Sequence, residues 1–357
     1  MNNRKTYLDI LKFISIFIVF IYHIVMDNYV VHDMVDLSLI FSFINRPNVH
    51  LAMLACSLFI MISGTTLCLS QDKKKLSYLD FIKNRFLRIL IPFYISYIIY
   101  YIIKCINVMH INPFYGQPIP RWRFIFTVLG MDEYVSANGI ATYSLGIGEW
   151  FLGCIILCYL VFILIYNLNK KYKIQMFIIF TLYYILICMN YDKLPFKIAA
   201  HMNFFCQIYN FYMGINLSNT KILDKYKKIF LPLSMFIILF IYTYQNVLPI
   251  HINICVSLMT FSMFILFYYL NDYFANNNII NKFINVFNKY SYEFFLTHHF
   301  VIYQINYILN YKKISYFSMF IVLILDIVFT CLFSYIVNIL SKNICSIYKK
   351  FTNSSLS

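Results

Sequence analysis

The chain has 357 residues, of which 61% are hydrophobic and only 12% are charged, against roughly 25% charged residues in an ordinary soluble domain. This composition excludes a water-soluble globular enzyme and favours an integral membrane protein. The net charge of +15 does not indicate nucleic-acid binding, because the Lys and Arg residues lie in short clusters between apolar runs instead of in one basic domain.

Ten apolar runs predict ten transmembrane α-helices, because a helix needs roughly 20 mostly apolar residues to cross the hydrocarbon layer. The first run lacks a small-residue cleavage site, so we interpret it as an uncleaved helix. We expect an all-α polytopic bundle that forms one integral-membrane domain over residues 1–357, without a soluble domain. The predicted spans are 8–26, 49–69, 86–106, 148–167, 174–191, 200–217, 229–245, 251–270, 290–309 and 315–337.

Basic residues predict the orientation, since they are retained on the cytoplasmic side of a membrane. They are concentrated in alternate connections, beginning with Arg4 and Lys5 and continuing with the cluster 73–75. Both ends of the chain are therefore expected in the cytoplasm, with the protein in the plasma membrane. The ten cysteines are scattered, which favours buried apolar side chains over a metal site.

The longest connection, about 107–147, is predicted to lie outside the cell. It contains the aromatic and proline-rich stretch NPFYGQPIPRW. Its apolar piece 124–131 is too short to span and suits an interfacial or re-entrant element. The connection either faces an acceptor or anchors the chain through Trp122 and Arg123 at the headgroup level.

The first span carries ionisable residues at membrane depth, which is costly and so marks a functional candidate. Lys12 and His23 are eleven residues apart, so three helical turns place them on one stripe with Asp9, roughly 16 Å apart along the axis. This pattern suits a path from a cytoplasmic anionic donor to a reaction centre at His23, whose imidazole can accept and return a proton. The structural alternative is an Asp9–Lys12 pair that anchors the helix end.

Two arginines open the third span, where Arg85 and Arg88 share a helix face at a spacing of three residues. Guanidinium groups bind phosphate in a forked geometry, which suits a phosphate-bearing donor. The alternative is that they are ordinary residues of the cytoplasmic boundary.

Further titratable groups are predicted at membrane depth in two later spans. Glu149 lies beside Trp150 at the outer start of the fourth span, and Glu293 precedes His298 in the ninth. Glu293 and His298 are about 140° apart around a helix, so each requires a partner from another helix. Asp326 of the tenth span is one candidate partner for a histidine of the ninth, although a structural ion pair is the simpler interpretation.

Five motifs follow one another along the chain. They are Lys12 and His23 separated by ten residues, FIMISG ending at Ser63 and Gly64, NRFLRILIPFY, WFL after Glu149, and SYEFFLTHH with Ser291, Tyr292 and His298. In this order they resemble the integral-membrane acyltransferase-3 family, which acylates surface polysaccharides, peptidoglycan, lipids and related acceptors. The family commonly has Arg at the position of Lys12 and Tyr at that of Phe295.

The resemblance implies that His23 is the essential catalytic residue and that Lys12 and Arg88 face cytoplasmic acyl-CoA. We expect an O-acyltransferase that moves an acyl group, acetyl by preference, from acyl-CoA to a hydroxyl of a cell-envelope polysaccharide or lipid-linked sugar. His23 acts as general base or through an acyl-histidine relay, and Glu149 orients the imidazole. Further candidates are Arg85 and Ser63 for the donor, and Asp9, Trp150, Tyr292, Glu293 and His298 for the polar core.

We expect no permanently bound cofactor and no metal, with acyl-CoA as co-substrate. The expected partners are the bilayer, a cell-surface glycan or lipid-linked sugar, and proteins of glycan synthesis, without nucleic acid. One alternative is a transporter or flippase for a glycan or its lipid carrier, which would use the polar interior as a passage. Another is a non-catalytic membrane subunit of a synthase complex, in which His23 would be replaceable.

Overall fold

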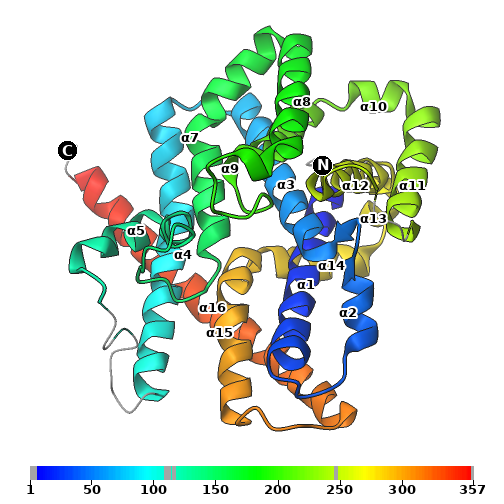
Figure 1. Cartoon of the computed structure of the whole chain (residues 1–357). Helices are drawn as coiled ribbons and strands as arrows, with labels where there is room; N and C mark the ends of the chain where they lie inside the picture. Colours follow the sequence, from blue (N-terminus) through cyan, green and yellow to red (C-terminus); the bar gives the residue numbers. More distant parts are fainter. Residues whose placement is uncertain (1–5, 108–113, 115–117, 245–247, 355–357) are drawn as a thin grey trace. The chain divides into compact units, whose positions relative to one another are not determined.

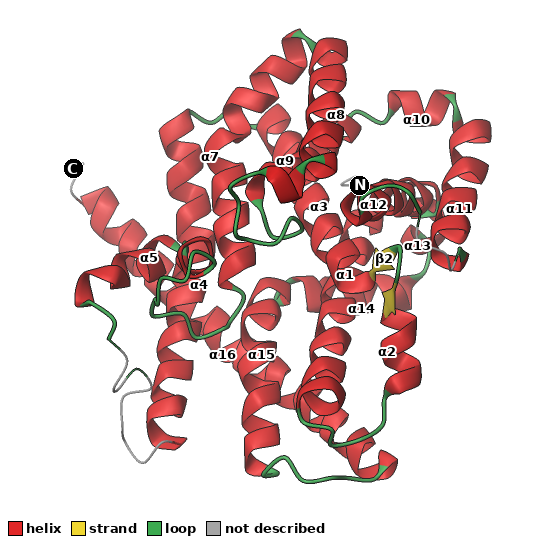
Figure 2. Ribbon diagram, in the orientation of Figure 1, coloured by secondary structure: helices red, strands yellow, loops and turns green. Residues whose placement is uncertain are grey.

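The computed structural model describes residues 6–107, 114, 118–244 and 248–354. Helix makes up 80% of the structure, which confirms the expected helical class (Figure 1 and Figure 2). Two short strands, β1 (Asn45–Arg46) and β2 (Val49–His50), pair antiparallel just before the second long helix. The orientation signal at Arg4 and Lys5 and most of the stretch 108–117 lie outside the described residues.

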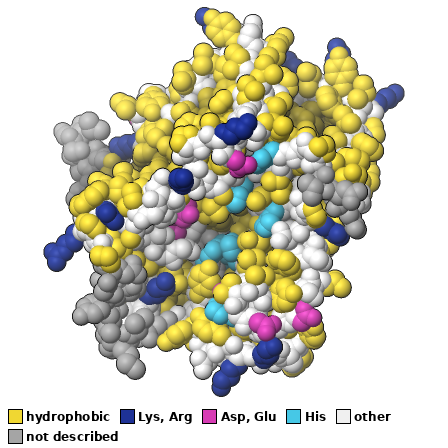
Figure 3. Space-filling view, in the orientation of Figure 1, with side chains coloured by type: hydrophobic (Ala, Val, Ile, Leu, Met, Phe, Trp, Pro, Cys, Tyr) yellow, Lys and Arg dark blue, Asp and Glu magenta, His cyan; other side chains and the backbone are white. Residues whose placement is uncertain are grey.

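Six helices within the described ranges are long and apolar enough to cross a membrane. They correspond to the first, second, third, fourth, eighth and tenth predicted spans, and their bounds are Thr6–Val31, Leu51–Lys73, Tyr78–Ile106, Glu149–Lys171, Ile252–Tyr269 and Tyr316–Tyr348. Hydrophobic side chains cover much of the face drawn in Figure 3, while Lys and Arg are few. The chain is therefore a membrane protein.

The other four predicted spans are helical but do not meet the same criterion, so a bundle of ten crossing helices is not confirmed. The helices are α8 (Lys173–Met189), α9 (Phe204–Leu217), α11 (Lys227–Thr243) and α15 (Ser291–Ile308). With 14 residues, α9 is roughly 21 Å long, short of the roughly 30 Å of a hydrocarbon core. By contrast, α15 has 18 residues, but it carries a glutamate and two histidines that lower its apolar character.

Contacts divide the chain into two compact units that alternate along the sequence. Unit 1 contains residues 1–25, 37–76 and 157–289, and unit 2 contains residues 26–36, 77–156 and 290–357. The long helix α7 (Glu149–Lys171) begins in unit 2 and continues into unit 1. Each unit is described by itself.

Unit 1 is built around α3 (Leu51–Lys73), which packs against α1 (Thr6–Val25), α9 and α12 (Ile252–Tyr269). Tyr7, at the start of α1, is buried with its ring edge-on to those of Phe264 and Tyr268 of α12, at 5.5 and 5.4 Å. The unit also contains α8, α11, β1 and β2. Its remaining elements are α2 (Ser38–Ile44), η3 (Tyr191–Lys193), α10 (Lys221–Lys225), α13 (Asn271–Ala275) and α14 (Asn278–Asn288).

Unit 2 is built around α16 (Tyr316–Ser354), which packs against α15 and α4 (Tyr78–Asn107). It opens with a π-helical turn, η1 (Met26–Val31), that continues directly from α1. Within η1, the buried carboxylate of Asp27 accepts a hydrogen bond from Asn306 of α15. The connection before α7 forms three short helices, η2 (Arg121–Arg123), α5 (Phe124–Leu129) and α6 (Asp132–Ser136).

Two helices extend well past their predicted ends. Ser77 caps α4 eight or nine residues before the apolar run, accepting a hydrogen bond from the backbone N–H of Asp80 at 3.2 Å and donating one to its carboxylate at 2.7 Å. At the other end of the chain, α16 continues to Ser354 because the polar segment after 337 contains no Gly or Pro to stop it. An apolar run predicts which part of a helix lies in the membrane. The ends of the helix itself are determined by capping residues and helix breakers.

Candidate functional site

His23 lies in the last turn of α1, half-buried, with its ring 5.1 Å from the ring of Tyr22. The ring of Tyr22 is in turn 4.9 Å from that of His50, the last residue of β2. The end of α1 and the start of α3 therefore place two imidazoles on either side of one phenol in unit 1.

Lys12 lies on the same unbroken helix as His23, so the predicted stripe is confirmed as a helical spacing. Its ammonium group is 6.0 Å from the centre of the Phe59 ring on α3, within cation–π range. Asp9, one turn earlier, accepts a hydrogen bond on its backbone carbonyl from Asn288 of α14 at 3.2 Å. The helix thus carries three half-buried ionisable residues, of which Asp9 and Lys12 each lie near a neighbouring helix of unit 1.

Ser63 is half-buried on α3, and its backbone carbonyl accepts a hydrogen bond from the Thr66 hydroxyl at 3.1 Å. The next residue, Gly64, is buried where α3 meets α9. A β-carbon on Gly64 would collide with the carbonyl oxygen of Phe211, and one on Gly214 of α9 would collide with that of Met61. The glycine of the FIMISG motif therefore serves the approach of two helix backbones.

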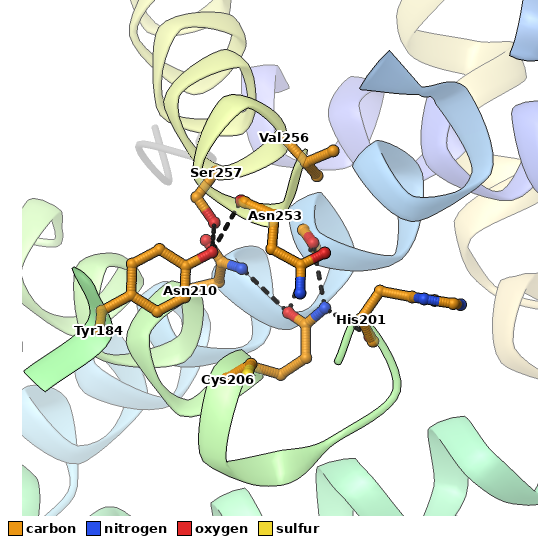
Figure 4. A pocket seen from close by; sticks show the side chains of 9 residues that line it. Tyr184, His201, Cys206, Asn210, Asn253, Val256 and Ser257 are labelled. Atoms are coloured by element: carbon orange, nitrogen blue, oxygen red, sulfur yellow. Dashed lines mark hydrogen bonds between the residues drawn. The ribbon is translucent and has the colours of Figure 1, made fainter. Parts of the chain in front are cut away.

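A small polar cavity lies between α3, α8, α9 and α12 within unit 1 (Figure 4). Gln207 is its central residue. Its amide nitrogen donates to the backbone carbonyl of His201 at 2.7 Å and to the Ser57 hydroxyl at 3.2 Å, and its amide oxygen accepts from Asn210 at 2.9 Å. The bond to Ser57 joins α9 to α3, and the three bonds together fix the amide in one orientation.

The opposite wall of the cavity comes from α8 and α12. The Tyr184 hydroxyl donates to the backbone carbonyl of Asn253 at 2.7 Å and shares a hydrogen bond with the Ser257 hydroxyl at 2.6 Å. Its ring stacks on that of Tyr209 at 4.3 Å. All nine residues that line the cavity are uncharged or carry an imidazole, and they are Ser57, Tyr184, His201, Cys206, Gln207, Asn210, Asn253, Val256 and Ser257.

His201 stands in the turn before α9, outside the membrane-spanning helices. Burial lowers its pKa to about 4, and the nearby His50 lowers it further in the same direction. Burial also lowers the pKa of His50. Both imidazoles are therefore neutral at physiological pH, and the cavity carries no net charge.

In unit 2, Glu149 is buried at the first position of α7. One carboxylate oxygen accepts hydrogen bonds from the backbone N–H groups of Leu145 and Gly146, at 2.8 and 3.1 Å. Gly146 and Gly148 both have positive φ angles, which permit the tight turn around the carboxylate. The adjacent Trp150 ring lies edge-on to that of Phe151 at 5.8 Å. Glu149 thus fixes the loop that leads into α7.

A second acidic residue of this region was not singled out from the sequence. Asp132, in the connection before α7, is fully buried and accepts a hydrogen bond from Thr127 at 3.0 Å. Burial raises its pKa to about 6, with smaller contributions from Glu149 and Glu133 in the same direction. In a loop, a single aspartate gives no periodicity from which burial can be inferred.

The SYEFFLTHH motif forms the first half of α15. Glu293 is buried and accepts a hydrogen bond from Asn338 of α16 at 2.8 Å, so the expected partner on another helix is present. The Tyr292 hydroxyl donates to the backbone carbonyl of Ile89 on α4 at 3.1 Å. Nδ1 of the buried His298 lies 2.6 Å from the carbonyl oxygen of Phe295.

Phe295, which stands where the resembled family has Tyr, packs against the beginning of α7. Its ring lies 5.0 Å from that of Phe151, and a β-carbon on Gly148 would come within 3.0 Å of it. The motif of α15 and the loop around Glu149 are therefore in direct contact within unit 2.

Arg85 and Arg88 lie on α4, which confirms their position on one helix face. The Arg85 guanidinium is 5.7 Å from the centre of the Phe81 ring, whereas Arg88 is exposed. Tyr292 bonds to the residue next to Arg88. The sequence candidates of unit 2 thus extend along α4, α15 and the start of α7, while Asp9, Lys12, His23 and Ser63 belong to unit 1.

The profile of a protein family described as an acyltransferase domain matches residues 5–339. The chain belongs to the acyltransferase-3 family. With the apolar helices described above, this makes it a membrane acyltransferase. No curated protein and no solved structure matches the chain.

For this acyltransferase-3 protein, the polar cavity is a further feature, besides Asp132, that sequence reasoning missed. Gln207 and Asn210 are three residues apart in an apolar segment, and Asn253 and Ser257 are four apart in another. Such spacings place two polar groups on one helix face. The two polar helix faces could therefore be predicted from the sequence. The spacings do not indicate that these two faces meet in one cavity.

Proposed function

We propose that this acyltransferase-3 protein transfers an acyl group, acetyl by preference, from cytoplasmic acyl-CoA to a hydroxyl of a cell-envelope polysaccharide or lipid-linked sugar. The observation that carries the proposal is the position of Lys12 and His23 on one continuous apolar helix. Eleven residues separate them, or roughly 16 Å along the axis. One helix therefore connects a cationic donor end to a proton acceptor.

His23 is assigned as the general base. Its neutral imidazole takes the proton of the acceptor hydroxyl as the oxygen attacks the acyl carbon of the thioester. A carbon–oxygen bond forms, the carbon–sulfur bond breaks, and the proton passes from His23 to the departing thiolate. In the alternative relay, the imidazole first forms the acyl-nitrogen bond and then gives the acyl group to the hydroxyl.

Donor contacts are assigned within each unit by itself, to Lys12 and Ser63 in unit 1 and to Arg85 and Arg88 in unit 2. Arg88 is exposed near the beginning of α4, so its guanidinium is accessible to a phosphate of CoA. Lys12 offers a compact charge in place of the arginine common in the family, and it suits a single phosphate oxygen better than a forked contact. This assignment needs no metal ion.

Glu149 is assigned a positioning role. Because its carboxylate holds two backbone N–H groups of the preceding loop, replacing it would release that loop at the start of α7. Glu293 and Tyr292 similarly tie α15 to α16 and α4. We assign the protein to the plasma membrane with both ends in the cytoplasm, where proteins of glycan synthesis supply the acceptor.

The test replaces His23 by Ala and by Gln in cells, with His32→Gln as a control for loss of a histidine. Membrane abundance is measured first, and O-acylation of envelope glycans is then measured by mass spectrometry, with polymer export followed separately. We expect both His23 variants to lose acylation and the control to retain it. Persistent acylation at equal abundance would exclude the proposed role, and lost export of a glycan that is unmodified in both strains would support the transporter.

A further inference from the structure

The cavity of unit 1 contains a hydrogen-bond donor that has no acceptor. Among the described residues, the side-chain nitrogen of Asn253 has no hydrogen-bond partner, although the residue is only 5% exposed. A buried amide donor without an acceptor is energetically unfavourable. Its neighbours Gln207, Tyr184 and Ser257 are already bonded to one another or to backbone groups. The amide nitrogen of Asn253 can therefore donate a hydrogen bond to a group that enters the cavity.

The size of the cavity limits that group. Its volume is about 10 Å³, which is at the lower limit for holding one water molecule or one hydroxyl. A whole sugar ring does not fit inside. A single hydroxyl or the end of a hydroxymethyl group does, with the rest of the molecule remaining outside.

The lining selects against charge. In the part of the chain that the structure describes, no Lys, Arg, Asp or Glu lines the cavity, and burial keeps the His201 imidazole neutral by lowering its pKa to about 4. An ion would lose its water here without gaining an opposite charge, which is strongly unfavourable. A phosphate of CoA is therefore excluded, whereas a neutral hydroxyl gains a donor from Asn253.

The cavity lies at the same end of unit 1 as the imidazole of His23. It is lined from the beginnings of α9 and α12, the first two turns of α3 and the last part of α8, and His23 is in the last turn of α1. The rings of His23, Tyr22 and His50 follow one another, and His50 in turn acts electrostatically on His201 at the cavity wall. A row of rings thus connects the proposed base with the cavity.

We propose that the cavity binds a non-reacting hydroxyl of a neutral sugar acceptor and so orients the acceptor for transfer. The proposal rests on the function proposed above, since it assigns the acceptor side of the same unit. Asn253 donates to the bound hydroxyl, and Gln207 holds the facing wall in place. Neither residue takes part in the chemical step.

The test is a binding measurement with the purified full-length protein, with methyl β-D-glucopyranoside and its N-acetylglucosamine equivalent as probes. Each is titrated against wild type, Asn253→Leu and Asn253→Ala, with the thermal midpoint as the readout. Ser262→Ala is the matched control, because its hydroxyl bonds to Leu258 within the same helix and lies outside the cavity. We expect about tenfold weaker sugar binding in both Asn253 variants, as expected for loss of one buried hydrogen bond, and no change in the control.

A second set of measurements distinguishes failure of the acceptor site from failure of the proposed acyltransferase function. Acetyl-CoA binding and turnover are measured on the same samples, and both should persist in the Asn253 variants with only the acceptor KM raised. Equal sugar binding by wild type and both variants would overturn the acceptor site and leave a structural water as the occupant. Transfer that is absent from the wild type while sugar binding still depends on Asn253 would overturn the proposed function and retain the site.

Discussion

Gly64 of α3 and Gly214 of α9 face each other across the closest approach of two helices in unit 1. A β-carbon on either one would collide with a backbone carbonyl oxygen of the opposite helix. Because a backbone cannot move aside as a side chain does, we expect Gly64→Ala and Gly214→Ala each to destabilise the protein by about 1–3 kcal/mol or more. The measurement is the thermal midpoint in detergent together with membrane abundance.

Ser63→Ala provides the control for the glycine variants, since Ser63 is half-buried on the same helix and is next to Gly64. It should leave the midpoint close to that of wild type. Glycine variants that melt like the wild type would show that α3 and α9 can separate without cost.

Glu293 and Asn338 form a buried polar contact between α15 and α16. Removing the amide by Asn338→Ala leaves the carboxylate buried without that donor, so we expect a loss of about 1–3 kcal/mol. Glu293→Gln retains a hydrogen-bonding side chain and should cost less. A double-mutant cycle with Glu293→Ala and Asn338→Ala checks the pair, because coupled residues give a non-additive result and independent ones do not.

Asp326 is fully buried in α16, and neither of its carboxylate oxygens has a hydrogen-bond partner among the described residues. The sequence offered a histidine of α15 as one candidate partner and a structural ion pair as the simpler interpretation, and the described residues show neither contact for this carboxylate. Because an unpartnered buried carboxylate is costly, Asp326→Asn should raise the thermal midpoint, and Asp326→Leu should raise it further. A lower midpoint in both variants would reveal a stabilising role for the carboxylate.

His201 makes stability depend on pH. Burial lowers its folded-state pKa to about 4, below the unfolded value of about 6.5. As the pH falls from 6.5 toward 4, the unfolded chain binds a proton that the folded chain does not, so stability is lost over this window. His201→Gln should flatten the decline of thermal midpoint with falling pH, and an unchanged slope would contradict the assignment.

The membrane orientation is open to a labelling test. Asn138, in the connection before α7, and Lys75, between α3 and α4, are both exposed and are predicted on opposite sides. In a background with Cys105, Cys331 and Cys345 replaced by Ser, since these are the cysteines that are not buried, each position is changed to Cys. An impermeant thiol reagent should label Asn138→Cys in intact cells and Lys75→Cys only after lysis, and the reverse pattern would invert the topology.

The helical class and the first helix could be predicted from the sequence, because apolar content and a spacing of eleven residues are local properties. The position of Arg85 and Arg88 on one helix face was confirmed for the same reason. The ends of the helices were harder to predict, as the Ser77 cap of α4 and the uninterrupted end of α16 show. These depend on single hydrogen bonds and on the absence of a breaking residue.

The candidate site was only partly predictable, because most of it depends on contacts between distant segments. Glu149 could be placed near the beginning of a helix, but its hydrogen bonds to the preceding loop require the positive φ angles of two glycines. The cavity around Gln207 requires four helices to converge. Such convergence leaves no trace in the periodicity of any one of them.

The helix that carries Lys12 and His23 is bound by residues synthesised near the end of the chain. Tyr7 donates its backbone N–H to Asn271, and Asn288 donates to the carbonyl of Asp9. Since a ribosome releases the N-terminus first, α1 must remain in the membrane without these partners until most of the protein has been made. Interrupted synthesis would therefore leave an inserted helix whose first turn lacks its hydrogen bonds to α13 and α14.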